Sequence, residues 1–137
     1  MKKSLAFLIL SVFLMLIIAS CNKKDSNTPA ATAASIQHKW TFLNAAVNQY
    51  YSGANHNVVV TGNSGDYMDF RAGGNLYVRI LSSQDTSSYS LIGTDKVVFD
   101  GTDTFTIQTL TNTTLKLYNK SVTSATEYDE ATYNLSR

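Results

Sequence analysis

Short segments of alternating apolar and polar residues run from Ile36 to the end of the chain, and this period of two is typical of β-strands. In residues 105–109, Phe105 and Ile107 alternate with polar residues, and in residues 114–118 Leu115 and Leu117 do the same. We find no window with the period of a helix. The pattern predicts strands over residues 39–50, 57–61, 66–71, 76–82, 88–92, 96–99, 105–109, 114–118 and 126–135.

Clusters of Gly, Asn, Asp and Ser separate these segments and are typical of tight turns. They occupy residues 52–55, 62–65, 72–75, 93–95 and 100–103. Eight or nine strands with a turn about every ten residues predict an antiparallel up-and-down meander, and a meander of that size closes into a barrel or splits into a sandwich. We therefore expect an all-β domain.

The N-terminus has a different pattern. Lys2 and Lys3 precede an apolar run over residues 5–19 that only Ser11 interrupts, as in a secretory signal peptide. The run is shorter than the roughly 20 apolar residues that a membrane-spanning helix needs. A signal peptide is therefore the favoured interpretation, and a retained membrane helix is the alternative.

The end of this run, Ile18-Ala19-Ser20-Cys21, resembles the lipobox of bacterial lipoproteins. The resemblance implies cleavage before Cys21, lipidation of Cys21 and attachment of the chain to a membrane through that lipid. The residues after Cys21 resemble an outer-membrane address, with the periplasmic or surface face left open. The alternative is a signal peptide in which Cys21 is incidental.

These features divide the chain into three parts. Residues 1–20 are the predicted signal peptide, residues 21–35 the lipidated N-terminus and a disordered tether, and residues 36–137 the folded domain. The tether has no large apolar side chain and can therefore bury nothing.

Composition changes the picture once the signal peptide is set aside. The whole chain is 44% apolar with a net charge of +1, and loss of Lys2 and Lys3 leaves slightly more acidic than basic side chains. A near-neutral domain lacks the basic excess that nucleic-acid binding needs, so we expect no nucleic-acid partner. One cysteine excludes an internal disulfide framework.

The order of aromatic and turn residues resembles a known family. It runs from Trp40 through Gly65-Asp-Tyr-Met-Asp-Phe-Arg-Ala-Gly-Gly-Asn-Leu-Tyr and Tyr89-Ser-Leu-Ile-Gly-Thr-Asp-Lys-Val-Val-Phe to Phe105-Thr-Ile-Gln-Thr-Leu-Thr-Asn-Thr-Thr-Leu-Lys-Leu. This pattern is similar to the lipocalin-like domain of small Bacteroidota-type lipoproteins. The resemblance implies a lipocalin-like, eight-stranded antiparallel β-barrel.

The interior of such a barrel is either filled by side chains or holds one small ligand. We expect a set of mostly large apolar side chains to point inward and line any cavity, with Arg79 able to pair with a ligand carboxylate. That role requires Arg79 to point inward, and an outward Arg79 paired with Asp69 or another surface acid is the favoured interpretation. The candidate ligand-lining residues are Trp40, Phe42, Phe70, Tyr77, Arg79, Tyr89, Leu91, Phe105, Ile107, Leu115 and Leu117.

No catalytic or metal-binding constellation emerges from the sequence. His38 and His56 have no partners at a metal-like spacing, and residues 62–65 are expected to form a hairpin turn rather than a nucleophile elbow. Glu127 and Asp129 are expected on a solvated strand face. We therefore expect a non-enzymatic protein without a cofactor, which binds a small apolar ligand. The alternative is a structural or protein-interaction module of the cell envelope with a solid core and an unidentified protein partner.

Overall fold

The computed structural model describes residues 33–137, so the predicted signal peptide, Cys21 and most of the predicted tether lie outside the described residues. The described chain forms one helical turn and nine strands. Their bounds are α2 Ala33–Ile36, β1 Lys39–Tyr51, β2 Ala54–Thr61, β3 Tyr67–Arg71, β4 Asn75–Ile80, β5 Ser83–Ile92, β6 Lys96–Phe99, β7 Asp103–Leu110, β8 Thr114–Ser124 and β9 Glu127–Ser136.

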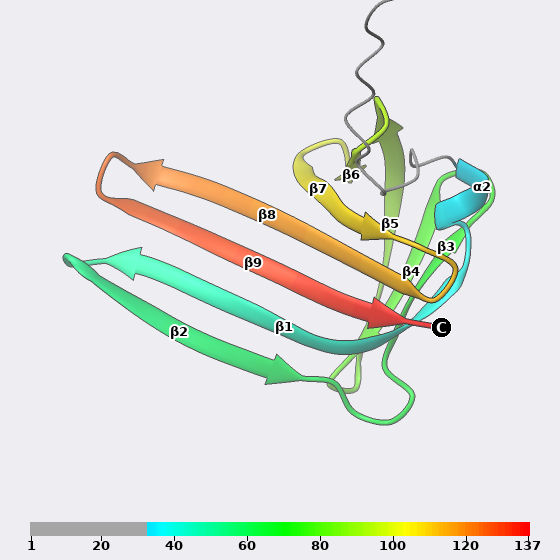
Figure 1. Ribbon diagram of the computed structural model, residues 1–137, viewed down its shortest axis with the longest axis horizontal. Coiled ribbons are helices and arrows are strands. Elements are labelled where there is room, and N and C mark those ends of the chain that lie inside the picture. Colours follow the sequence, from blue (N-terminus) through cyan, green and yellow to red (C-terminus); the bar gives the residue numbers. More distant parts are fainter. Residues whose placement is uncertain (1–32) are drawn as a thin grey trace, which may run out of the picture.

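Eight of these strands close into an antiparallel barrel. From β3 to β9 each strand pairs with the next, and β1 closes the ring by pairing with β3 at one end and with β9 along most of its length (Figure 1). The predicted all-β, lipocalin-like barrel is thereby confirmed, and its turns are the predicted ones at Gly53, Gly73, Gly93 and Gly101, each with a positive φ.

The second strand does not enter the barrel. β2 folds back on β1 and pairs with residues 44–51, on the outer side of the region where β1 pairs with β9. The loop over residues 62–66, the β2–β3 loop, then leads to β3, which pairs with residues 39–41 on the same edge of β1. It joins two strands that follow each other along that edge and is not the expected hairpin turn.

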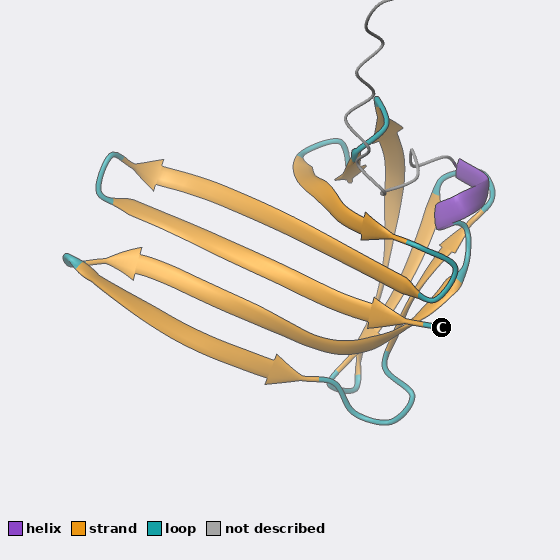
Figure 2. Ribbon diagram, in the orientation of Figure 1, coloured by secondary structure: helices purple, strands orange, loops and turns teal. Residues whose placement is uncertain are grey.

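Beyond the barrel, the long strands β2, β1, β9 and β8 continue side by side as a four-stranded sheet (Figure 2). We call its outer part, residues 46–61 and 119–132, the arm. Tyr50 stacks on Tyr128 with 5.2 Å between ring centroids, and Lys120 pairs with Glu130 at 2.8 Å, so cross-strand contacts continue to the far end of the arm.

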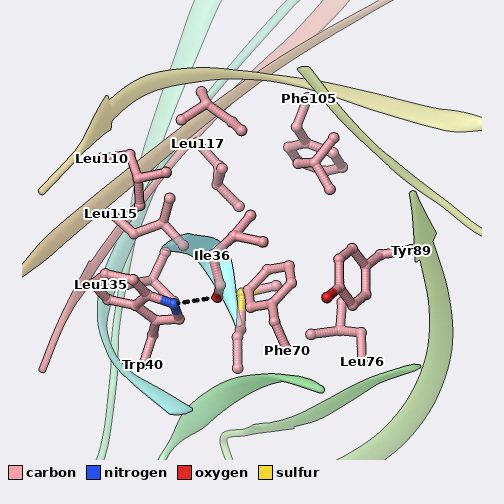
Figure 3. Packing of buried hydrophobic residues seen from close by; sticks show 13 residues of the cluster. Ile36, Trp40, Phe70, Leu76, Tyr89, Phe105, Leu110, Leu115, Leu117 and Leu135 are labelled. Atoms are coloured by element: carbon pink, nitrogen blue, oxygen red, sulfur yellow. Dashed lines mark hydrogen bonds between the residues drawn. The ribbon is translucent and has the colours of Figure 1, made fainter. Parts of the chain in front are cut away.

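The hydrophobic core lies inside the barrel and includes the helical turn α2. The side chain of Ile36 is fully buried among Leu115, Trp40 and Phe70 (Figure 3). Trp40 Nε1 donates to the Ile36 carbonyl at 3.0 Å, and this bond holds α2 against the barrel. The helical turn therefore extends the described fold to Ala33, three residues before the predicted boundary of the domain.

Asp66 joins two turns at the barrel wall. Its carboxylate accepts the backbone N–H of Asn63 at 2.8 Å and that of Leu81 at 3.0 Å, and the residue is only 3% exposed. The N–H bonds from Leu81 and Asn63 lower the pKa of Asp66, and the charge of Arg79 adds to this effect. The β2–β3 loop is thus held to the turn between β4 and β5.

Candidate ligand cavity of the barrel

A cavity of about 180 Å³ lies inside the barrel. It is lined by Met68, Leu76, Val78, Ile80, Ser87, Phe99, Phe105, Leu117 and Tyr133. The lining is almost entirely apolar. Ligand pockets of proteins usually measure about 300 Å³ or more, whereas an engineered apolar cavity of about 150 Å³ holds benzene. The cavity therefore has room for one aromatic ring and is too small to enclose a long acyl chain.

The wall of the cavity is built by strand alternation in β3 and β4. Met68 pairs with Val78 and Phe70 with Leu76, which places these apolar side chains on the inner face. The partners on the outer face are Tyr67 with Arg79 and Asp69 with Tyr77.

The polar groups of the wall are mostly engaged by the protein itself. The Tyr89 hydroxyl donates to the Arg71 carbonyl at 3.0 Å, and the Ser87 hydroxyl contacts the carboxylate of Asp100. Burial raises the pKa of Tyr133, and the negative charge of Asp103 raises it further. The phenol of Tyr133 therefore remains protonated at neutral pH, and Tyr133 and Ser87 are the two hydroxyl-bearing residues of a mostly apolar lining.

Aromatic rings dominate one side of the cavity. Phe105 lies 4.7 Å from Phe99 and 5.6 Å from Tyr133 between ring centroids, and Phe99 also contacts Phe70 at 6.0 Å. The contact between Phe105 and Tyr133 is edge to face, at 75° between ring planes. A planar ligand can add to this cluster by the same edge or offset contacts.

Most of the candidate lining residues lie inside the barrel, although few of them reach the cavity. Phe105 and Leu117 line it directly. The others pack as core around it and fill most of the interior: Trp40, Phe42, Phe70, Tyr89, Leu91, Ile107 and Leu115.

Tyr77 lies on the opposite face from the one expected, and Arg79 lies on the outer face, so neither side chain lines the cavity. The Arg71 guanidinium covers the outward ring of Tyr77, 4.4 Å from its centroid. Arg79 lies beside Tyr67 near the β2–β3 loop, where its positive charge contributes to the lowered pKa of Asp66. The carboxylate of Asp69, considered as a partner for Arg79, instead accepts from Arg71 at 2.9 Å.

Sequence reasoning missed Leu76, Val78 and Ile80 because Tyr77 and Arg79 alternate with them in the same strand. Both sets of residues have a period of two. The aromatic ring of Tyr77 led to the prediction that its set faces inward, and this prediction was wrong. A usable signal was present, since Leu76, Val78 and Ile80 form an unbroken apolar row while Arg79 would bring a charge into the interior.

Other candidate chemistry is dispersed over the surface. His38 contacts Trp40 edge to face, and His56 stacks on Tyr51 at 4.0 Å between ring centroids. Within residues 33–137 no three His, Cys, Asp or Glu side chains gather as a metal site. No helix in this part of the chain is long and apolar enough to cross a membrane.

Comparison with known protein families, with curated proteins and with solved structures gave no match for this chain.

Proposed function

We propose that this protein is a lipid-anchored lipoprotein of the outer membrane whose lipocalin-like barrel binds a small apolar ligand and catalyses no reaction. The apolar cavity of about 180 Å³ inside the barrel carries the binding part of the proposal. Its size limits the ligand class to single-ring aromatic or similarly compact apolar molecules. A protonated phenol at Tyr133 suits a ligand with one hydrogen-bond acceptor.

The small cavity and the closely packed core around it support ligand binding rather than catalysis. Packed aromatic rings form one side of the cavity and core side chains surround it, so the lining is held in place before a ligand arrives. A preformed apolar site loses little freedom on binding, which favours affinity for a ligand that matches its shape. Its lining offers apolar contacts and few reactive groups.

A thermal-shift assay with benzene, toluene and palmitate as probes tests the binding proposal. Benzene or toluene should raise the melting temperature of the mature chain, because a ligand that binds only the folded state stabilises it by mass action. Palmitate should not. Val78→Phe, which fills the cavity, should abolish the shift, whereas Val59→Phe on exposed β2 should retain it. An equal shift in both variants would refute binding in the cavity.

The anchor is tested separately. The proposal predicts that a labelled fatty acid is incorporated into the full chain in a bacterial host and that Cys21→Ala abolishes the labelling. A Cys21→Ala chain that still carries the label would show that lipidation occurs elsewhere.

The arm favours a second candidate function, that of an interaction module in the cell envelope. Of the seven large apolar side chains recorded as exposed among the described residues, four lie on the arm: Tyr51, Val58, Val59 and Val122. The arm therefore exposes apolar side chains that do not contribute to the barrel core.

A further inference from the structure

The arm is bordered by two open strand edges, which differ in their charges and in the regularity of their pairing. On one side is β2, whose outer edge pairs with no strand in the part of the chain that the structure describes (Figure 1). On the other side is the outer half of β8, residues 119–124, beyond the region where β8 pairs with β7. Open edges are templates for pairing with another chain, and proteins usually protect them.

The β8 edge carries two of the usual protections. Lys120 places a charge on it, paired with Glu130 at 2.8 Å, and the register with β9 shifts between Val122 and Ser124. A charge and a bulge both oppose the addition of a further strand. We therefore expect this edge to remain unpaired.

The β2 edge has none of these protections. Ala54-Asn-His-Asn-Val-Val-Val-Thr61 contains no Asp, Glu, Lys, Arg or Pro. Its register with β1 is unbroken over eight residue pairs, so no bulge twists it away. Three successive valines give it a strong strand propensity.

The hairpin geometry determines which backbone groups of β2 face outward. Ser52 and Gly53 have φ values of 53° and 76°, as in a two-residue type I′ turn, which makes Tyr51 and Ala54 a hydrogen-bonded pair. Hydrogen-bonded pairs alternate along an antiparallel ladder, so the even-numbered residues of β2 bond to β1. The 2.8 Å bond from Gly62 N to Leu43 O fits this alternation.

The odd-numbered residues therefore present their backbone N–H and C=O groups to the open edge. These residues are Asn55, Asn57, Val59 and Thr61. They are spaced so that an antiparallel second copy of β2 satisfies all of them at once. With a two-fold axis at Val58, Asn55 bonds to Thr61 of the other copy and Asn57 to Val59.

The side chains suit the same register. Val58 meets its own equivalent at the axis, and His56 meets Val60, on one face of the sheet. Since β2 contains no Asp, Glu, Lys or Arg and His56 lies opposite Val60, the symmetric pair opposes no two like ionisable side chains. Symmetric dimers require such a self-complementary patch.

We propose that the protein forms a two-fold dimer by antiparallel pairing of β2 with β2 of a second copy, which joins the two arms into one continuous sheet. A single strand pair is small beside the roughly 1,200 Å² that stable interfaces bury. The dimer is therefore reversible, and it depends on protein concentration.

Cysteine crosslinking of the full chain in bacterial membranes tests this dimer. Residue 58 forms a non-hydrogen-bonded pair with its equivalent, where Cα atoms lie about 4.5 Å apart, within the range that a disulfide bridges. Under mild oxidation Val58→Cys should therefore shift to twice the monomer mass on a non-reducing gel. The wild-type chain, with Cys21 alone, gives the background.

Matched variants test the edge and the register. Val122→Cys, at a position 64% exposed against 53% for Val58, should remain monomeric. His56→Cys and Val60→Cys should each remain monomeric alone and crosslink when the two chains are produced together. Crosslinking of Val122→Cys or of His56→Cys alone to the same extent as Val58→Cys would indicate random collision and overturn the proposal.

A backbone variant gives an independent test. Asn57→Pro removes an N–H that faces the open edge while leaving the bonds between β2 and β1 in place. Introduced beside Val58→Cys, it should abolish the crosslink. Undiminished crosslinking of the folded double variant would refute backbone pairing at this edge, and if the proline prevents folding, the paired crosslinks of residues 56 and 60 still decide the register.

Discussion

Replacing Leu117 by alanine should destabilise the barrel by about 3 to 4 kcal/mol. Leu117 is fully buried and lines the cavity. Removing three carbon groups costs about 2.4 kcal/mol at roughly 0.8 kcal/mol for each buried group. The void adds about 1 kcal/mol if some 40 Å³ remains open, at about 24 cal/mol per Å³. Neighbouring side chains cannot fill this void from the side of the existing cavity, so little of the cost is recovered.

Urea denaturation followed by circular dichroism measures this change directly. The melting temperature should also fall by roughly 12 to 32 °C, since each kcal/mol shifts a domain of this size by about 4 to 8 °C. Val122→Ala in the same strand is the control, because its side chain is 64% exposed and should change stability by less than about 0.5 kcal/mol. A cost below about 1.5 kcal/mol for Leu117→Ala would refute a closely packed interior around the cavity.

Two further predictions concern the β2–β3 loop. Gly62→Ala should lower stability by about 2 kcal/mol or more in urea denaturation, because the added Cβ would lie 2.3 Å from the Phe42 carbonyl oxygen. Gly53→Asn, in the turn between β1 and β2, is the control and should change stability little, since the site is open and Asn tolerates a positive φ. The lowered pKa of Asp66 predicts a stability contribution that is present at neutral pH and lost as the pH falls below about 4 and through the folded-state pKa. Urea midpoints at pH 7 and pH 3 should therefore differ more in the wild-type chain than in Asp66→Asn, and equal differences would contradict this role.

The domain class could be predicted from the sequence because its determinants are local. Alternation places apolar side chains on one side of each strand, and Gly-Asn-Asp clusters end the strands wherever the chain must turn. Segment 96–99 was predicted with its observed bounds, and β1 was predicted to within one residue. Other strands are longer than predicted, since β8 continues through Lys120 and Ser121, where the alternation is lost but pairing with β9 persists.

The period of two in each strand does not by itself determine the lining of the cavity. In β4 the rows Tyr77–Arg79 and Leu76–Val78–Ile80 alternate equally well, so the period alone cannot say which one faces inward. Pairing with β3 decides it, because Val78 and Leu76 stand opposite buried Met68 and Phe70. Two cations also cover Tyr67 and Tyr77 on the outer face, at 3.9 and 4.4 Å from their ring centroids.

By itself, the sequence determined the all-β class, the turns and most of the residues that fill the barrel, since each follows from neighbours a few positions apart. Only the tertiary structure decided that β2 leaves the meander, that α2 joins the core through Ile36 and that the interior retains a cavity. These features depend on how segments distant in the sequence pack together and on which strand edges pair. Such competition between long-range contacts has no counterpart in a local pattern.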